Sequence, residues 1–163
     1  MHCRFRRAGG FTLIELLVTI AVLAILMLMA LPTYLDKLVR DQVAEAMPLA
    51  NLAKPAVESA WRSGQELPAD NAAAGLPPAE QIVNEVVSSV SVDQGAIHIV
   101  FGNKAHGTLK GRTLSLRPAV VEGTPAVPVA WLCGRAGPPP PMMARGADRT
   151  DVPAGLLPLR CRA

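Results

Sequence analysis

The chain opens with a long apolar run that is interrupted at three polar positions. Residues 11–31 are apolar apart from Thr12, Glu15 and Thr19. A run of roughly 20 apolar residues is long enough to cross a bilayer core of about 30 Å as a helix. The sequence therefore predicts a membrane-spanning helix over residues 11–31.

Beyond Pro32 the pattern becomes amphipathic, with apolar residues recurring at steps of three and four. Pro48 and Pro55 interrupt this stretch, either as helix boundaries or as kinks. We expect kinks, because the apolar period continues through both prolines, and thus one helix over residues 11–62. Its apolar positions are Leu35, Leu38, Val39, Val43, Ala46, Leu49, Ala53, Val57, Ala60 and Trp61.

The remainder of the chain alternates between turn residues and short β-rich segments. Residues 63–78 are rich in Ala, Gly, Pro, Asn and Asp and predict a loop. An antiparallel sheet of about four strands packed on the amphipathic half of the helix would give an α+β fold. The expected strands are residues 86–92, 96–101, 112–117 and 127–133.

Within these strands, alternation assigns side chains to faces. One face is expected to hold Ile97, Ile99 and Phe101, and another Leu114 and Leu116. The last strand is expected to place Val127, Val129, Trp131 and Cys133 together.

Two histidines are expected at the surface, His98 in a strand and His106 in a turn.

Charge is distributed unevenly. Three arginines precede the apolar run, and without them the 16 basic residues fall to 13, equal to the 13 acidic residues. Residues 36–93 hold nine acidic and four basic residues, whereas residues 104–163 hold nine basic and three acidic residues. This asymmetry fits a nucleic-acid surface, complementary faces on a self-assembling subunit, or an ordinary solvated surface.

The basic leader, with Arg4, Arg6 and Arg7, predicts orientation in the membrane. By the positive-inside rule the leader lies in the cytoplasm and the rest of the chain on the opposite side. A secretory signal would need a small-residue cleavage site after the apolar run, and no convincing one is present. The small residues Ala8, Gly9 and Gly10 lie before the run instead.

Glu15 is the most informative single residue. A carboxylate within an apolar helix costs a few kcal/mol and usually has a partner and a function. If the Gly10–Phe11 bond is cut, the new amine of Phe11 lies one helical turn away and can neutralise Glu15 in the same or a neighbouring subunit. The alternative is a tolerated glutamate at the membrane interface.

The segment Gly10-Phe11-Thr12-Leu13-Ile14-Glu15-Leu16 closely resembles the class III signal of type IV prepilins and the related type II secretion pseudopilins. The resemblance implies cleavage after Gly10 by a prepilin peptidase and N-methylation of Phe11. It also implies that Glu15 guides each subunit into register during assembly.

The second half of the chain also resembles type IV pilins, in Trp131-x-Cys133 and in three further segments. The chain departs from the pilin pattern in a loop that carries a run of four prolines followed by two methionines, residues 138–143. The other resembling segments are residues 95–101, Gly102-Asn103-Lys104, and Val152-Pro153-Ala154 to Pro158 before Cys161.

Three cysteines are present. Cys3 lies in the leader, where a reduced thiol is expected. Cys133 and Cys161 would pair in an oxidising compartment and close a C-terminal loop of about 29 residues. A zinc site is the weaker alternative, because the two cysteines lie far apart without a nearby histidine.

No enzyme motif, metal site or cofactor site is predicted, so the leading hypothesis is a structural subunit of a type IV pilus that serves motility, adhesion or DNA uptake. The alternatives are a minor pilin that binds DNA or a surface, a type II secretion pseudopilin, and a membrane-anchored enzyme. A DNA-binding surface would use Arg112, Arg117, Arg135, Arg145 and Arg149.

The pilin resemblance also implies partners and locations. The expected partners are identical pilin subunits, prepilin peptidase, an inner-membrane assembly platform, the membrane, and a DNA or surface receptor. The subunit is expected to cross the inner membrane once with a periplasmic head and then to enter an extracellular pilus. The expected division is a removed leader at 1–10, a helix at 11–62, a connecting loop at 63–85 and a sheet head at 86–163 with the disulfide loop 133–161.

Overall fold

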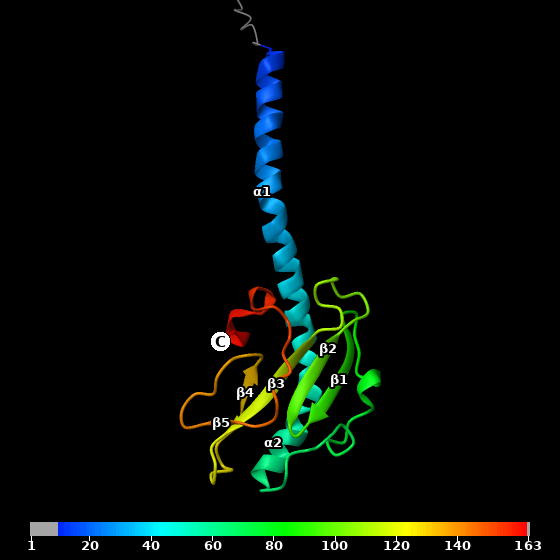
Figure 1. Ribbon diagram of the computed structural model, residues 1–163, viewed down its shortest axis with the longest axis vertical. Helices are drawn as coiled ribbons and strands as arrows, with labels where there is room; N and C mark the ends of the chain where they lie inside the picture. The colour runs from blue at the N-terminus through cyan, green and yellow to red at the C-terminus, as the bar shows by residue number, and fades with distance from the viewer. Residues whose placement is uncertain (1–9, 163) are drawn as a thin grey trace, which may run out of the picture. The chain divides into compact units, whose positions relative to one another are not determined.

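The computed structural model describes residues 10–162, so Cys3 and the arginines of the leader lie outside the described residues. The chain divides into two compact units, Met1–Lys37 and Leu38–Ala163. Helix α1 (Leu13–Ala46) contributes to both (Figure 1). Its backbone stays helical through Pro32, in agreement with the prediction that the helix continues past this proline.

The helical stretch is broken after Ala46, which corrects the prediction of one kinked helix to Arg62. A 3-10 helix, η1 (Met47–Leu52), follows α1, and a second α-helix, α2 (Lys54–Arg62), follows η1. Pro48 and Pro55 each lie in the first turn of a new element. Proline is tolerated there because the missing N–H has no partner within a helix in any case.

The apolar period nevertheless continues across these breaks, as the sequence predicts. Each of the three elements buries small apolar side chains against the sheet, which keeps the path of the chain along one face. The buried residues of this path are Val39, Val43, Ala46, Ala50, Ala53, Val57 and Ala60.

The sheet is antiparallel in the order β1-β2-β3-β4, and the structure adds a short strand, β5, that pairs with β3 (Figure 1). Residues 127–129 were expected in the last strand but precede it, and the backbone N–H of Val127 closes a turn on the carbonyl of Thr124 (3.1 Å). The strands are β1 (Val87–Asp93), β2 (Ala96–Phe101), β3 (Thr113–Val120), β4 (Ala130–Cys133) and β5 (Met143–Ala144).

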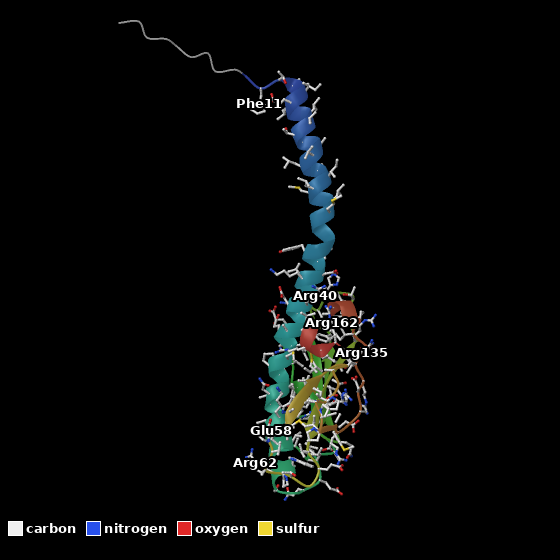
Figure 2. The ribbon with its side chains drawn as sticks, turned by 90° about the vertical axis from the view of Figure 1, so that its left-hand side faces the viewer. Phe11, Arg40, Glu58, Arg62, Arg135 and Arg162 are labelled. Carbon is white, nitrogen blue, oxygen red and sulfur yellow. A yellow bond between two sulfur atoms is a disulfide. The ribbon has the colours of Figure 1, made fainter. Side chains whose placement is uncertain are left out.

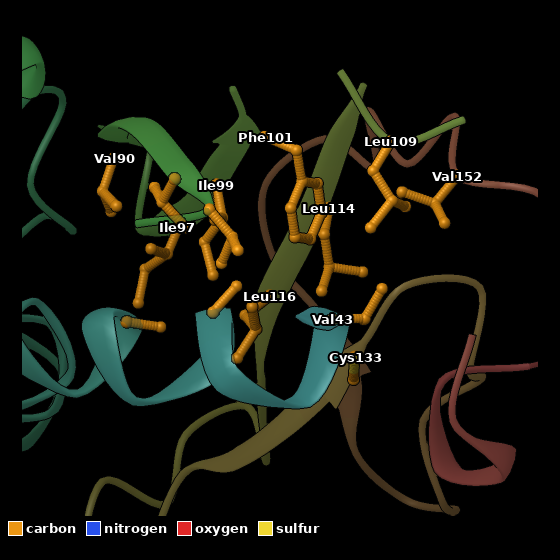
Figure 3. Packing of buried hydrophobic residues seen from close by; sticks show 14 of the residues in the cluster. Val43, Val90, Ile97, Ile99, Phe101, Leu109, Leu114, Leu116, Cys133 and Val152 are labelled. Carbon is orange, nitrogen blue, oxygen red and sulfur yellow. The ribbon is translucent and has the colours of Figure 1, made fainter. Parts of the chain in front are cut away.

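The core lies between the sheet and the helical path from Val39 onward. The two predicted strand faces are confirmed: their five side chains are at most 2% exposed and point toward the helix (Figure 3). Burying each large apolar side chain stabilises the fold by about 1.5–3 kcal/mol. These side chains are Ile97, Ile99, Phe101, Leu114 and Leu116.

His98 corrects a second prediction, because it is buried rather than at the surface. Its side chain is 2% exposed, and Nδ1 hydrogen-bonds Ser115 Oγ at 2.9 Å. The opposite face of the sheet is covered here by the C-terminal segment, where the N–H of Arg149 donates to Ser115 Oγ (2.9 Å) and Thr150 Oγ1 accepts from the N–H of Ser115 (3.1 Å). His106, in contrast, is exposed as expected.

The loop after α2 is anchored by Asn71, whose amide serves three backbone groups. Its Nδ2 donates to the carbonyls of Pro77 and Val90, both at 3.0 Å, and its Oδ1 accepts from the N–H of Val92 (2.6 Å). The bonds of Asn71 to Val90 and Val92 fix the loop to β1, the edge strand of the sheet. One further 3-10 helix, η2 (Ala79–Gln81), precedes β1.

Candidate functional site

The apolar part of α1 leaves its side chains exposed in the single chain. From Leu13 to Met29 each large apolar side chain is at least half exposed, and none of the window that could cross a membrane is buried. By length and composition this helix is able to span a bilayer. An exposed apolar surface of this size needs a membrane or other apolar helices around it.

The first turn of α1 is capped by Thr12, a feature that we did not predict. The N–H of Glu15 donates to Thr12 Oγ1 (3.3 Å), and the N–H of Leu16 donates to the carbonyl of Thr12 (3.2 Å). The spacing Thr-x-x-Glu is the signal that would have revealed this cap. Glu15 in the first turn is also favoured by the helix dipole.

Glu15 itself is exposed and pairs with no basic group among the described residues 10–162. Phe11 lies just before the helix and is 76% exposed (Figure 2). A carboxylate, a free aromatic residue and an apolar surface thus occupy one end of an unpartnered helix. The predicted cleavage at Gly10 and methylation of Phe11 are not tested by this geometry.

The C-terminal segment is closed by the Cys133–Cys161 disulfide, which confirms the predicted pairing. The two Cα atoms lie 4.5 Å apart, and both cysteines are buried. Gly134 has φ +56°, and a Cβ there would lie 2.7 Å from the carbonyl oxygen of Cys161. The close approach of the two chain segments therefore requires glycine at this position.

The C-terminal segment is also fastened to α1 by Arg40, and Arg162 of the segment itself bonds the same acceptor. Arg40 Nε and Arg162 Nη2 both donate to the carbonyl of Gly155, at 3.0 and 3.1 Å (Figure 2). Arg162 Nε adds a bond to the carbonyl of Leu157 (2.9 Å). This segment carries the short helices η3 (Ala154–Leu156) and η4 (Leu159–Cys161).

Three of the five arginines predicted for nucleic-acid contact are engaged by carboxylates. Arg145 pairs with Glu122 and Arg149 with Asp93, while Arg117 lies 3.9 Å from a carboxylate oxygen of Asp148. Arg117 also donates to the carbonyls of Gly134 and Ala136, both at 3.3 Å.

The remaining two arginines do not assemble a basic surface with them. Arg112 donates to the carbonyls of Thr108 (2.8 Å) and Asp151 (2.9 Å). For Arg135, no side-chain hydrogen bond or salt bridge is present within the described part of the chain. Three of the five arginines are thus paired with carboxylates within the fold, which does not favour the nucleic-acid interface predicted from the charge asymmetry.

A cluster that the sequence did not reveal joins α2 to β4. Trp131 Nε1 donates to Glu58 Oε1 (2.8 Å), and the ammonium of Lys54 lies 5.6 Å from the centre of the Trp131 ring. Burial lowers the pKa of Lys54, the negative charge of Glu58 raises it, and the positive charge of Arg160 lowers it. Glu58 and Trp131 lie 73 residues apart in the sequence, so no local sequence pattern indicates their contact.

A metal centre finds no support in the part of the chain that the structure describes. No group of three or more histidine, cysteine, aspartate or glutamate side chains is placed to hold an ion there. The two described cysteines are joined to each other.

Comparisons with known proteins bear on the two units separately. Residues 39–162 match a family model described as pilin (bacterial filament), and residues 5–31 match the prokaryotic N-terminal methylation motif. A type IV major pilin protein, PilE1, of Neisseria gonorrhoeae is 35% identical over 159 residues, covering 94% of this chain and 86% of the relative.

Two further relatives carry the name fimbrial protein. One, from Neisseria meningitidis serogroup A, is 37% identical over 127 residues, which is 77% of this chain and 72% of the relative. The other, EcpC of Eikenella corrodens, is 39% identical over 129 residues, which is 76% of this chain and 80% of the relative.

Proposed function

The chain belongs to the pilin family, and we propose that it is a structural subunit that polymerises into a type IV pilus through its N-terminal helix. The observation that carries the proposal is the unpartnered apolar surface of α1, which begins just after the exposed Phe11 and holds a single carboxylate, Glu15. Related chains named type IV major pilin and fimbrial protein support the same role.

We infer that maturation precedes assembly. A prepilin peptidase cuts after Gly10 and methylates the new amine of Phe11, in keeping with the methylation motif matched over residues 5–31. The amine of Phe11 then lies within a turn of Glu15, either in the same subunit or in a neighbour. Pairing the two charges offsets the cost of holding each of them in an apolar environment.

The apolar helix determines where the subunit resides. Before assembly it crosses the inner membrane once, with the leader in the cytoplasm and the unit from Leu38 onward in the periplasm. An assembly platform in the inner membrane then transfers the helix from lipid into the core of an extracellular filament. Because both environments are apolar, the transfer costs little hydrophobic free energy.

The role of a major subunit is favoured over the two alternative filament roles. Three of the arginines that a DNA-binding minor pilin would use are paired with carboxylates. The relatives named above are major pilins and fimbrial proteins, and neither name describes a secretion pseudopilin.

The intact mass of the chain in sheared filaments tests the proposal. We expect a polypeptide that begins at Phe11, is one methyl group heavier than the unmodified chain and is two hydrogens lighter because of the disulfide. A Gly10→Val variant is expected to keep its first ten residues and to stay in the membrane fraction. A wild-type chain found only in membranes, with residues 1–10 attached and both thiols free, would overturn the proposal.

A further inference from the structure

A surface hollow of about 300 Å³ lies between η1 and the C-terminal segment. Its polar lining consists of the ammonium of Lys54, the guanidinium of Arg160 and the amide of Asn51, and no carboxylate lines it. The other lining residues are Ala44, Met47 and Pro48.

Among residues 10–162, the hydrogen-bond partners of the two cations are neutral. Lys54 Nζ donates to Asn51 Oδ1 (2.8 Å), and Arg160 Nη2 donates to Met47 Sδ (3.1 Å). Neither takes part in a salt bridge within residues 10–162. An amide oxygen and a thioether satisfy donors without neutralising their charge, and the thioether is a weak acceptor.

Glu58 is the carboxylate that acts on Lys54, and it is bonded to Trp131 rather than lining the hollow. Its Oε1 accepts from Trp131 Nε1, and its side chain is absent from the lining. Burial and the facing positive charge of Arg160 both disfavour the ammonium form of Lys54, in opposition to Glu58. An anion in the hollow would relieve this repulsion.

The position of both cations is fixed by the fold. Lys54 is the first residue of α2 and lies over the ring of Trp131. Arg160 precedes Cys161, whose sulfur is bound to Cys133. The hollow therefore exists before a ligand arrives, which lowers the entropy cost of binding.

We propose that this hollow binds an oxyanion group, a carboxylate, phosphate or sulfate, between Lys54 and Arg160. A guanidinium offers two parallel donors to such a group, and an ammonium adds a compact positive charge. Asn51 uses its oxygen on Lys54, so its amide N–H groups are available to the ligand. The oxyanion comes either from an acidic side chain of a second copy of this chain or from a soluble molecule.

Inorganic phosphate is the probe for the test, titrated into the unassembled full chain in detergent micelles at constant ionic strength. Amide chemical shifts are followed by NMR. We expect saturable shifts at Asn51, Lys54 and Arg160, and no saturable shift around Lys110, an exposed lysine on a turn. Because no filament is needed, the result does not depend on the proposed function.

Matched variants separate the site from general charge. Lys54→Gln and Arg160→Gln are each expected to weaken phosphate binding about tenfold, while Lys54→Arg retains it and Lys110→Gln leaves it unchanged. Shifts that never saturate, or a phosphate affinity that is equal in wild type and in both glutamine variants, would overturn the proposal.

The same titration with assembled filaments identifies the source of the oxyanion. If an acidic side chain of a neighbouring subunit occupies the hollow, filaments do not take up phosphate, and Arg160→Gln filaments dissociate at lower salt than wild type. If the ligand is soluble, filaments bind phosphate as the unassembled chain does.

Discussion

Glu15 and His98 are ionisable side chains, one in each unit of the chain, and their surroundings differ. Glu15 is exposed on an apolar helix and needs an external partner wherever that helix is surrounded by lipid or by other helices. His98 is enclosed in the sheet, and its Nε2 is buried without a hydrogen-bond partner in the described structure. The surroundings of His98 favour the neutral imidazole, because burial lowers its pKa.

At Glu15, replacement by glutamine keeps size and polarity but removes the charge. If Glu15 pairs with the amine of a neighbouring subunit, Glu15→Gln should lower the yield of sheared filaments at least about tenfold. Membrane insertion should improve, since a neutral side chain is cheaper to bury in lipid. The measurement compares subunit amounts in the sheared and membrane fractions.

Thr19→Val is the control for this experiment, because it also removes a polar group from the apolar helix. The hydroxyl of Thr19 is bonded to the carbonyl of Leu16 within the helix, at 2.8 Å. Normal filament yield is expected from this variant. Normal yield from Glu15→Gln as well would contradict the pairing of Glu15 with an amine.

At His98, burial lowers the imidazole pKa most, and the positive charge of Arg149 lowers it further, against smaller opposing effects of Asp93 and Asp148. The unfolded chain therefore binds the proton more readily than the folded chain does. Stability is fully present above about pH 6.5, the ordinary value, and is lost as the pH falls from there toward the lower pKa of the folded state.

In His98→Gln, the free energy of unfolding should decrease less as the pH falls. The glutamine amide can still hydrogen-bond Ser115, but it does not titrate in this range. The free energy of unfolding, measured in urea between pH 7 and about pH 5, should vary less with pH in this variant. His106→Gln, at an exposed turn position, serves as the matched control. An equal pH dependence in wild type and His98→Gln would exclude burial of a neutral imidazole as the cause.

At the scale of elements, periodicity predicts faces more reliably than it predicts ends. The spacing of apolar residues, every three or four positions, correctly predicted that Val43 and Val57 lie in the core. Both the α-helical and the 3-10 segments keep one side toward the sheet. It did not predict the breaks at Met47 and Lys54, where the missing N–H of proline decides between a kink and a new start.

Among the strands, too, features set by the local sequence were predicted and features set by distant segments were not. Residues 96–101 were predicted with their observed bounds because alternation and the following Gly102 agree. Strand β5 carries no local signal, since Ala144 pairs only because β3 continues to Val120. The burial of His98 likewise depends on a segment about 50 residues further along the chain.

Gly134 gives an element-scale prediction, because it joins β4 to the C-terminal segment. Gly134→Ala places a methyl group against the carbonyl of Cys161 at a positive φ, so the free energy of unfolding should fall by about 1–3 kcal/mol. Gly137→Ala, in the same loop with nothing within 4 Å, should change it by less than about 0.5 kcal/mol. Urea unfolding of both variants is the measurement, and equal stabilities would mean that the loop shifts freely.

At the scale of the whole molecule, folding brings parts of the acidic and basic regions of the sequence together. The acidic region contributes Asp93 and Glu85, which pair with Arg149 and Lys104 of the basic region. Such exposed pairs stabilise the fold by at most about 1 kcal/mol each. Lys54 and Arg160 take part in no salt bridge among residues 10–162.

The unit Leu38–Ala163 holds every residue of the described hydrophobic core together with the disulfide. The segment after β4 contributes few apolar residues to that core, chiefly Val152 and Leu157, and the disulfide adds a covalent constraint to its hydrogen bonds and to the short pairing of β5 with β3. Restricting a loop of this length in the unfolded chain is worth about 3.5 kcal/mol in the chain-entropy model.

Replacing both cysteines, as Cys133→Ala with Cys161→Ala, should therefore lower the free energy of unfolding by about 2–4 kcal/mol. Unfolding should remain cooperative, because the helix–sheet core keeps all of its members except the two cysteines. Urea denaturation of the double variant, compared with reduced wild type, measures this loss. If reduced wild type and the double variant agree while both unfold in two steps, the C-terminal segment is a separate folding unit rather than part of the single core described here.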